Sequence, residues 1–533
     1  MNPEDSVPVL IAGGGPVGLA TALELAHHSV GSLVVEPRAT VSWLRPRAKT
    51  VSARTMELFA RWGLATTIRD RAPLPVAWSD EAVFATRLLG REITRFTGCF
   101  GLDLGGSDRA AEPGQQAPQP LVEEILREAV DASPHAALLT GWRVEALRQD
   151  PDGVTASLAG PDGAAREIRA AYAAGCDGGR GVSRAAIGAR YEGADDARPN
   201  VNIVFRAPGL AERVPHGPAV HYWVLDPSRP GLLGRLDLDA TWWCIAQGVD
   251  RAAGEADPAR LVRELVGADI EAEILATDPW QARMLLADRY GEGRIFLAGD
   301  AAHQNPPWGG HGFNTGVGDA VNLGWKLAAV LNGWAPPALL ASYEAERRPI
   351  AARTIEEAAR NMATLAPELS DPRLTGTDEE FAAARPAVAE AVHRTKDGEF
   401  HSLDLVLDYT YEGSPVVAEG PGRRLPHRWL RPGDSLYSRL GRGLTLLGDL
   451  AAPGVRDFTA AARELGIPLT TADHRAPGPA GPLTLVRPDQ HVAWYGADGR
   501  AARAVLRRVT GHPYRPLTAP GRQEERPRSR NRP

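Results

Sequence analysis

Cysteine and lysine are both scarce in this chain of 533 residues, whose basic side chains are almost all arginine. The three cysteines, Cys99, Cys176 and Cys244, lie far apart and form no C-x-x-C pair. This spacing excludes a zinc ribbon and a dithiol redox centre, and it does not indicate a disulfide framework. We therefore expect a protein of the reducing cytoplasm. The sequence has no cluster of residues with metal-ligand spacing, so we also predict that it binds no metal.

The chain lacks both a strong charge and a long hydrophobic run. Its formal net charge is −6, with 24% charged residues, which gives it no general attraction to nucleic acid and predicts no nucleic-acid partner. Residues 8–23 are apolar, but Glu4 and Asp5 stand where a signal peptide carries basic residues, and glycines interrupt the run. The run is also short for a membrane span, so we predict a soluble protein with no membrane partner.

A dinucleotide-binding pattern opens the chain. It predicts a buried strand over residues 7–12, a helix over 16–28 and a second strand over 32–35. Between the first strand and the helix, Gly13, Gly15 and Gly18 form G-x-G-x-x-G. These glycines permit a tight turn, a close approach to a pyrophosphate and close packing of helix on strand. Glu36 closes the second strand, where a carboxylate can accept a hydrogen bond from a ribose hydroxyl, which favours FAD or NAD over NADP.

A second glycine-rich loop lies far along the chain. Residues 294–298 predict a strand that leads into Gly299-Asp300, and the loop 306–315 ends at a helix with an apolar face from Val317 to Leu331. A loop at a helix N-terminus offers N–H groups to an electron-rich ligand. Asp300, at the carboxyl end of a strand, can accept from a sugar hydroxyl. Two such loops suggest one extended ligand that is held at both ends.

The two motifs, and above all residues 299–328 (GDAAHQNPPWGGHGFNTGVGDAVNLGWKLA), resemble the FAD-dependent aromatic hydroxylases of the para-hydroxybenzoate hydroxylase type. These are group A flavoprotein monooxygenases, and the likeness is closest to those that tailor bacterial aromatic polyketides. The resemblance implies an α/β fold: a Rossmann-like FAD-binding domain, an inserted antiparallel β-sheet substrate domain and a C-terminal thioredoxin-like domain. The implied boundaries are 1–185 and 286–395 for the FAD-binding domain with its long helices, 186–285 for the substrate sheet, 400–515 for the thioredoxin-like domain and 520–533 for a disordered tail.

The resemblance also implies which residues bind FAD. Arg47 matches the arginine that reaches the pyrophosphate and ribityl chain, and Gln119 matches an FAD-contacting glutamine. Asp177 begins the family's DG motif, although residues 179–181 replace its usual serine and Arg184 keeps its distal arginine. The full set of predicted FAD-binding residues is Gly13, Gly15, Pro16, Gly18, Glu36, Arg38, Arg47, Gln119, Val144, Asp177, Asp300, Pro307, Gly310, Gly312, Phe313 and Asn314.

Candidate catalytic residues lie in the second loop. His311, Pro307 and Trp308 are implied at the flavin edge, and an imidazole with its ordinary pKa near 6.5 could tune the flavin charge or relay a proton. His303 is expected to be a structural hydrogen-bonding residue. The predicted substrate-binding residues are Tyr222, Trp223, Trp308 and Phe96, which offer flat apolar surface to a polycyclic ligand. Only alternate residues of a strand face the same side, so any of these aromatic residues could instead belong to the core.

Further elements follow from local patterns. Strands are predicted over 201–206, 219–225, 231–236, 241–247 and 444–447, a helix over 458–465 and a hairpin over 483–487 and 491–494. Residues 336–395 are predicted to be helical, and the charge run 344–348 is predicted to be a solvated helix face.

The resemblance implies a single-component monooxygenase. NADPH, or NADH, reduces FAD, the reduced flavin activates O2 as a C4a-(hydro)peroxide, and one oxygen atom passes to a polycyclic aromatic substrate of antibiotic or secondary-metabolite biosynthesis. The single G-x-G-x-x-G implies that the nicotinamide cofactor binds without a domain of its own. Baeyer–Villiger insertion, a multi-step oxidative rearrangement, a non-oxygenating FAD protein and a simple FAD dehydrogenase remain alternatives. Both a monomer and a homodimer are compatible with the sequence.

Overall fold

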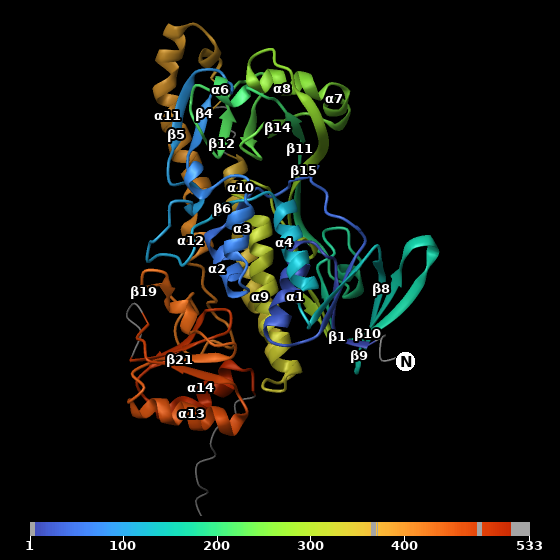
Figure 1. Cartoon of the computed structure of the whole chain (residues 1–533), viewed down its shortest axis with the longest axis vertical. Coiled ribbons are helices and arrows are strands. Elements are labelled where there is room, and N and C mark those ends of the chain that lie inside the picture. Colours follow the sequence, from blue (N-terminus) through green and yellow to red (C-terminus); the bar gives the residue numbers. More distant parts are fainter. Residues whose placement is uncertain (1–5, 364–368, 370, 477–481, 513–533) are drawn as a thin grey trace, which may run out of the picture.

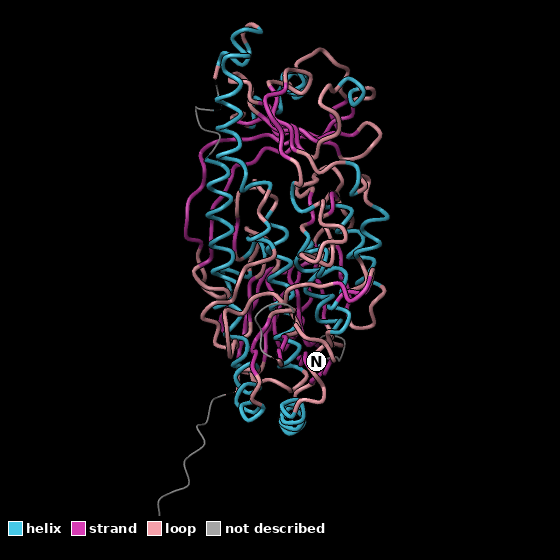
Figure 2. The backbone as a smooth tube through the Cα atoms, turned by 90° about the vertical axis from the view of Figure 1, so that its left-hand side faces the viewer, coloured by secondary structure: helices cyan, strands magenta, loops and turns pink. Residues whose placement is uncertain are grey.

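The computed structural model describes residues 6–363, 369, 371–476 and 482–512, so the tail predicted for 520–533 lies outside the described residues. The molecule is elongated, with a sheet and its helices at one end, a dinucleotide fold in the middle and a small α/β domain at the other end (Figure 1). Long helices run along its length with the sheets beside them (Figure 2). Within the described ranges, no helix has the length and apolar character needed to cross a membrane.

The middle domain is built on a sheet with the strand order β16-β17-β10-β1-β2-β7. Its strands are β16 (Gly291–Glu292), β17 (Ile295–Leu297), β10 (Ala165–Gly175), β1 (Ser6–Ala12), β2 (Ser32–Glu36) and β7 (Ala136–Thr140), extended from β10 by β9 (Gly153–Ala159) and β8 (Arg143–Asp150). The strands from β17 to β7 are parallel, and their apolar residues form one core with three helices, α1 (Pro16–His27), α4 (Gln119–Asp131) and α9 (His311–Leu331). Helices α1 and α9 lie side by side (Figure 1).

The predicted strand, glycine turn, helix and strand at the start of the chain are confirmed as β1, α1 and β2. Pro16 occupies the first turn of α1, where its missing N–H would have no helical partner. Gly13 has a φ of +102°, and a Cβ on Gly18 would overlap the carbonyl oxygen of Gly13. These contacts explain why the turn requires glycine at both positions.

A second sheet has the order β18-β15-β11-β14-β13-β12-β4-β5. Its strands are β18 (His303–Gln304), β15 (Glu273–Ala287), β11 (Tyr191–Arg206), β14 (Thr241–Gln247), β13 (Gly231–Arg235), β12 (His221–Val224), β4 (Ala82–Ala85) and β5 (Glu92–Phe96). Strands β4, β5 and β18 come from outside the range 186–285 predicted for this sheet. Strand β4 joins by pairing parallel to β12, a long-range contact that no local pattern signals.

The two faces of this second sheet bury different residues. One face, here called the inner face, carries Trp223 and Trp243 and packs with Trp308 and with helix α11 (Asp378–Phe400). The other, the outer face, carries Tyr222 and packs under helix α8 (Pro258–Val266). Strand geometry produces this division, because successive side chains point to opposite sides. The inner face is therefore the one that meets the second glycine-rich loop.

Helix α10 (Ser342–Ala363) and α11 confirm the predicted helical region, but the predicted solvated face over residues 344–348 is wrong in part. Glu346 and Arg347 are each 1% exposed. Glu346 lies 2.6 Å from Lys326 Nζ, and the Nε of Arg347 donates to Asp319 at 2.8 Å. Both charges are buried because partners from α9, far away in the sequence, neutralise them.

The C-terminal domain is a mixed sheet with the order β22-β21-β23-β24 and two helices. The elements are β21 (Leu444–Gly448), β22 (Leu469–Ala472), β23 (Leu483–Val486), β24 (Val492–Gly496), α13 (Pro453–Leu465) and α14 (Ala502–Val509). The predicted strand, helix and hairpin are confirmed, with α13 starting five residues earlier than expected. The fold as a whole is the predicted α/β class. The β23–β24 turn contacts the middle domain, where Asp489 accepts from Arg54 and Asn322.

Arg487 is the cation at the centre of this domain contact. Its guanidinium donates to Glu346 at 2.8 Å and to Asp489 at 2.6 Å, and its side chain is fully buried. We expect Arg487→Met to lower the free energy of unfolding by about 3–5 kcal/mol, because it leaves buried carboxylates without their main partner. Denaturant unfolding followed by tryptophan fluorescence measures this loss. Arg500→Met, at a side chain 91% exposed, is the matched control and should change little; equal stability of the two variants would contradict the prediction.

Candidate functional site

A groove of about 1180 Å³ crosses the carboxyl ends of four parallel strands of the first sheet. Ala12, Glu36, Cys176 and Ala298, at or just beyond the ends of β1, β2, β10 and β17, all line it. This is the edge at which open α/β sheets bind ligands. All the predicted FAD-binding residues line the groove except Gly18, which packs under the turn, and Asn314.

The start of α1 fits a pyrophosphate. No side chain of the described residues caps this helix N-terminus, which opens onto the groove at Gly15 and Pro16. A Cβ on Gly15 would meet no described atom within 4 Å, and the φ of Gly15 is −75°, which any residue can adopt. Uncapped N–H groups, the positive end of the helix dipole and open space beside Gly15 are together what a diphosphate requires.

A fixed carboxylate stands beside this turn. Glu36 accepts from the N–H of Gly14 at 2.7 Å, from the N–H of Arg38 at 3.0 Å and from Nε of Arg38 at 2.6 Å. Arg38 also donates to Glu123 at 3.2 Å. These bonds hold Glu36 at the wall of the groove, where a ribose hydroxyl can donate to it.

Ser183, six positions after Asp177, contacts the DG motif in place of the family's usual serine. Oδ2 of Asp177 accepts from both the N–H and the Oγ of Ser183 at 2.9 Å, while its Oδ1 is buried and has no partner in the described part of the chain. Burial raises the pKa of Asp177. Arg184 lies over the ring of Tyr191, 3.8 Å from its centroid, which makes it a structural residue here. The free oxygen of Asp177 fits a donor on a bound cofactor.

Asp319 anchors the turn that carries Asp300. Its Oδ2 accepts from the N–H of Gly299 at 3.1 Å and lies 2.7 Å from Nε2 of His303, while its Oδ1 accepts from Arg347. This agrees with the structural role expected of His303. The turn is held from beneath, and the side chain of Asp300 is exposed to the groove.

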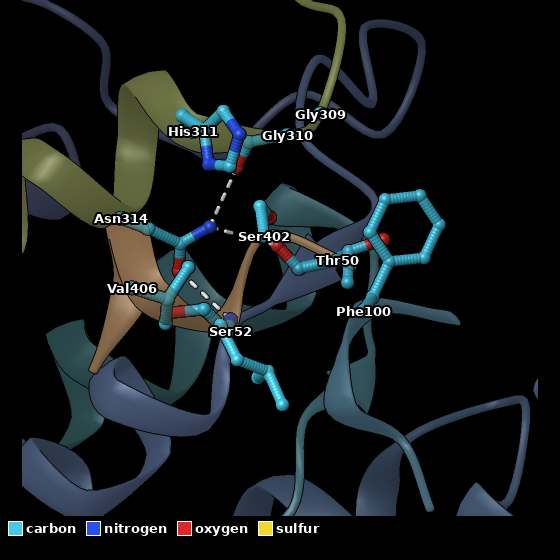
Figure 3. Close-up of a pocket in the computed structure, with 10 residues that line it drawn as sticks. Thr50, Ser52, Phe100, Gly309, Gly310, His311, Asn314, Ser402 and Val406 are labelled. Atoms are coloured by element: carbon cyan, nitrogen blue, oxygen red, sulfur yellow. Dashed lines mark hydrogen bonds between the residues drawn. The ribbon is translucent and has the colours of Figure 1, made fainter. Parts of the chain in front are cut away.

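The second loop is fastened by Asn314 (Figure 3). Its Nδ2 donates to the carbonyl oxygens of Gly310 at 2.7 Å and Thr50 at 3.2 Å, and its Oδ1 accepts from the N–H of Ser52 at 2.9 Å. Asn314 therefore joins the start of α9 to β3 (Thr50–Val51) rather than lining the large groove. Beside it lies a small cavity of about 20 Å³, room for roughly one water molecule.

His311 lies between the groove and this small cavity and lines both. It is 4% exposed, and its Nε2 is buried without a hydrogen-bond partner among the described residues. Burial lowers the pKa of His311 to about 4, with Asp404 opposing the shift. The expected pKa near 6.5 is therefore corrected: at neutral pH His311 is an uncharged hydrogen-bonding group at this position.

The predicted substrate-binding aromatics lie in different surroundings. Trp308 packs against Trp280 at the inner face, with ring centroids 5.8 Å apart. Trp223 stacks on Phe84 and is fully buried, and Phe96 is packed against α11. Tyr222 is on the outer face, with its hydroxyl donating to the carbonyl of Gly217. The structure thus argues against Tyr222, Trp223 and Phe96 as pocket residues, because protein side chains already cover their rings.

Sequence reasoning misses several charged groove residues. Arg45, Arg143 and Arg180 line the groove together with Arg38 and Arg47, and no motif marks them. Arg38, Arg45 and Arg143 are paired with carboxylates, whereas Arg47 and Arg180 form no ion pair with the described residues and can meet an anionic ligand such as a diphosphate. The only available signal was their proximity in sequence to Arg47, Val144 and Asp177.

Comparison with known families agrees with this geometry. The family described as FAD binding domain matches residues 6–358, and the family described as aromatic-ring hydroxylase, C-terminal, matches residues 418–513. The chain belongs to the FAD-binding aromatic-ring hydroxylases. It is an FAD-dependent monooxygenase of aromatic substrates, as the resemblance implied.

Full-length relatives of this hydroxylase family are known. The chain is 34% identical to a 12-dehydrotetracycline 5-monooxygenase/anhydrotetracycline 6-monooxygenase of Streptomyces rimosus subsp. rimosus, over 92% of this chain and 95% of that protein. It is similar to the rebeccamycin biosynthetic enzyme RebC solved with reduced flavin, with a TM-score of 0.88, 36% identity and coverage of 95% and 99%. Aklavinone-11 hydroxylase, solved with FAD and aklavinone, gives a TM-score of 0.79, 30% identity and the same coverage.

Two glycines of the first motif separate folding from cofactor binding. Gly15→Ala adds a methyl group to empty groove space and should give a folded protein that retains little FAD, because the methyl occupies the space expected for the pyrophosphate. Gly18→Ala overlaps the backbone of Gly13 and should destabilise the domain itself. Flavin absorbance per protein and thermal melting measure the two effects. A Gly15→Ala protein with full FAD content would contradict the proposed phosphate position.

Burial of neutral His311 predicts acid sensitivity. Its pKa is about 4 in the folded protein and near 6.5 when unfolded, so the unfolded chain takes up this proton first as the pH falls. Stability is therefore lost between pH 6.5 and pH 4, and His311→Gln should remove a pH-dependent loss of about 3 kcal/mol. Unfolding free energies of both proteins across this pH range measure the difference. Parallel pH profiles would contradict the prediction.

Proposed function

We propose that this monooxygenase takes electrons from NADPH or NADH and inserts one oxygen atom of O2 into a polycyclic aromatic, polyketide-like substrate. Substrate, O2, NADPH and a proton then yield oxygenated substrate, NADP⁺ and water. The observation that carries the proposal is the meeting of the cofactor groove, at Pro307 and His311, with the aromatic inner face of the second sheet, at Trp308 and Trp280. Relatives named for tetracycline and aklavinone chemistry support a polycyclic substrate.

The groove residues divide the work of holding FAD. The N-terminus of α1, with Glu36 and Arg38, would hold the ADP half, and Asp300 would accept from the ribityl chain. The N-terminus of α9 begins at His311 after Gly310, with no side-chain cap from the described residues. Its free N–H groups and dipole would stabilise negative charge on a flavin ring held beside Gly312 and Phe313.

When bound and reduced, FAD supplies the activation of O2 and the transfer of one oxygen atom. The protein's part is to exclude water and position the acceptor. Trp308 is buried against Trp280, and Phe100 closes the small cavity beside His311. A dry, closed site limits the loss of hydrogen peroxide to solvent. Neutral His311 can form a hydrogen bond through its free Nε2, and it can relay a proton without a net charge only when its other ring nitrogen releases one.

The proposal predicts ligand-stimulated turnover with oxygen incorporation. The yellow, FAD-loaded protein should oxidise NADPH faster when a polycyclic phenol or quinone is added, and under 18O2 one labelled oxygen atom should appear in the product. Absorbance at 340 nm measures the rate of NADPH oxidation, and mass spectrometry measures the 18O content of the product. The site of the label separates aromatic hydroxylation from insertion into a ring.

Two outcomes would contradict the proposal. Bound FAD with no stimulation by several polycyclic scaffolds would favour a non-oxygenating flavoprotein. Turnover with an artificial electron acceptor and no labelled product would favour a dehydrogenase. Glu36→Gln is the matched variant, because it keeps the shape of the groove wall while weakening the acceptor for the ribose.

A further inference from the structure

Lysine occurs at three positions in the sequence, and none of the three side chains is exposed. Nζ of Lys326 lies 2.6 Å from Glu346, and Nζ of Lys396 lies 3.0 Å from Glu399. Lys49 forms no ion pair and no side-chain hydrogen bond with the described residues. A half-buried ammonium group without a charged partner loses part of its hydration and gains no ion pair in return, so this position calls for a reason.

Lys49 lies between the cofactor groove and the inner face of the second sheet. Its neighbour Ala48 lines the groove, and the carbonyl of Thr50 accepts from Asn314. The Lys49 ammonium, in contrast, lies 4.1 Å from the ring centroid of Trp243, which is 2% exposed on the inner face. A cation–π contact of this kind holds the ammonium in place without neutralising its charge.

The imidazole of His221 lies against the same Trp243 ring as the Lys49 ammonium. The ring of His221 lies 5.5 Å from that of Trp243 and 5.2 Å from that of Phe100, between centroids. Its Nδ1 is buried and finds no partner within the described ranges. Burial, and then the charge of Lys49, lower the pKa of His221 to about 3, so it is a neutral hydrogen-bonding group.

The remaining charged neighbour does not neutralise Lys49. Asp278, on β15, forms its ion pair with Arg45 at 3.8 Å. Burial lowers the pKa of Lys49 to about 8, against the opposing effects of Cys244 and Asp278, so the ammonium is still charged at neutral pH. The result is a half-buried cation over the ring of Trp243, with His221, which keeps a free nitrogen, packed against the same ring and against Phe100.

We propose that Lys49 binds an ionised oxygen of the aromatic substrate, with His221 as a second hydrogen-bonding group and Phe100 beside the ring. The proposal rests on the proposed function and narrows its substrates to acidic aromatics: phenolates, enolates or carboxylates. Fixing the acidic oxygen at Lys49 orients the ring toward the flavin-edge loop. A phenolate or enolate held there is also more electron-rich, which favours oxygen transfer to its ring.

Matched ligand pairs test this on the FAD-loaded protein without any turnover. Anthraquinone-2-carboxylate is compared with its methyl ester, and 2,4-dinitro-1-naphtholate with its methyl ether, by changes in flavin absorbance and fluorescence. Lys49→Met should weaken binding of the acid about 10- to 100-fold and leave the neutral partner within about twofold, as expected for a hydrogen bond to a charged group. Lys49→Arg should keep most of the preference. The two pairs distinguish a carboxylate from a phenolate.

Arg500→Met serves as the control variant, because its side chain is 91% exposed. Flavin content and melting temperature establish that each variant is folded. The proposal is overturned if the parent binds no acid more tightly than its neutral partner, or if Lys49→Met weakens both partners equally. The two proposals can fail separately. If 18O is incorporated but the acid binds no more tightly than its neutral partner, only the role of Lys49 is overturned. If the acid binds more tightly but no 18O is incorporated, only the oxygenation is overturned.

Discussion

Two buried carboxylates on the α9–α10 helix pair, Asp319 and Glu346, hold the parts of this protein in register. Asp319 bonds the backbone of Gly299 and the guanidinium of Arg347, and Glu346 bonds Lys326 and Arg487. Burial alone would raise the pKa of Glu346, but Arg487 and Lys326 hold it well below its usual range. Each carboxylate is stable only where its cations come together, so these ion pairs specify one arrangement of the domains.

The same helix pair connects these charges to the cofactor groove. Helix α9 starts at the flavin-edge loop, passes Asp319 under the Asp300 turn and reaches Lys326 near the C-terminal domain. The C-terminal domain meets α9 through its β23–β24 turn, where Asn322 donates to Asp489. A domain without a C-x-x-C pair thus supports the position of α9, and so of the loop that begins it. The contacts of this domain therefore reach the flavin-edge loop through a single helix, α9.

Local physics accounts for what the sequence could predict. A Cβ on Gly18 would overlap the carbonyl oxygen of Gly13, so a contact within a few residues requires glycine there. Gly13 is restricted by its positive φ and by the backbone of Cys176, which is distant in sequence. The buried pair Glu346 and Arg347 could not be recognised, because their partners lie on another helix or another domain. The same holds for β4, whose place beside β12 depends on a pairing across more than a hundred residues. A charge run on a helix reads as solvated until its distant partners are known.

The site divides in the same way. Of the predicted cofactor-binding residues, the glycine turn and Glu36 follow from spacing, whereas Arg47, Gln119 and Asp177 are implied only by the resemblance. The inner face instead takes one side of each strand, and the sequence cannot tell Trp223 from Tyr222 until the register is known. At the wall of the groove, Asp177 and His311 each keep a buried polar atom without a partner from the described residues. These two atoms face the space in which the cofactor is expected, so a bound ligand can supply the partners that the protein does not.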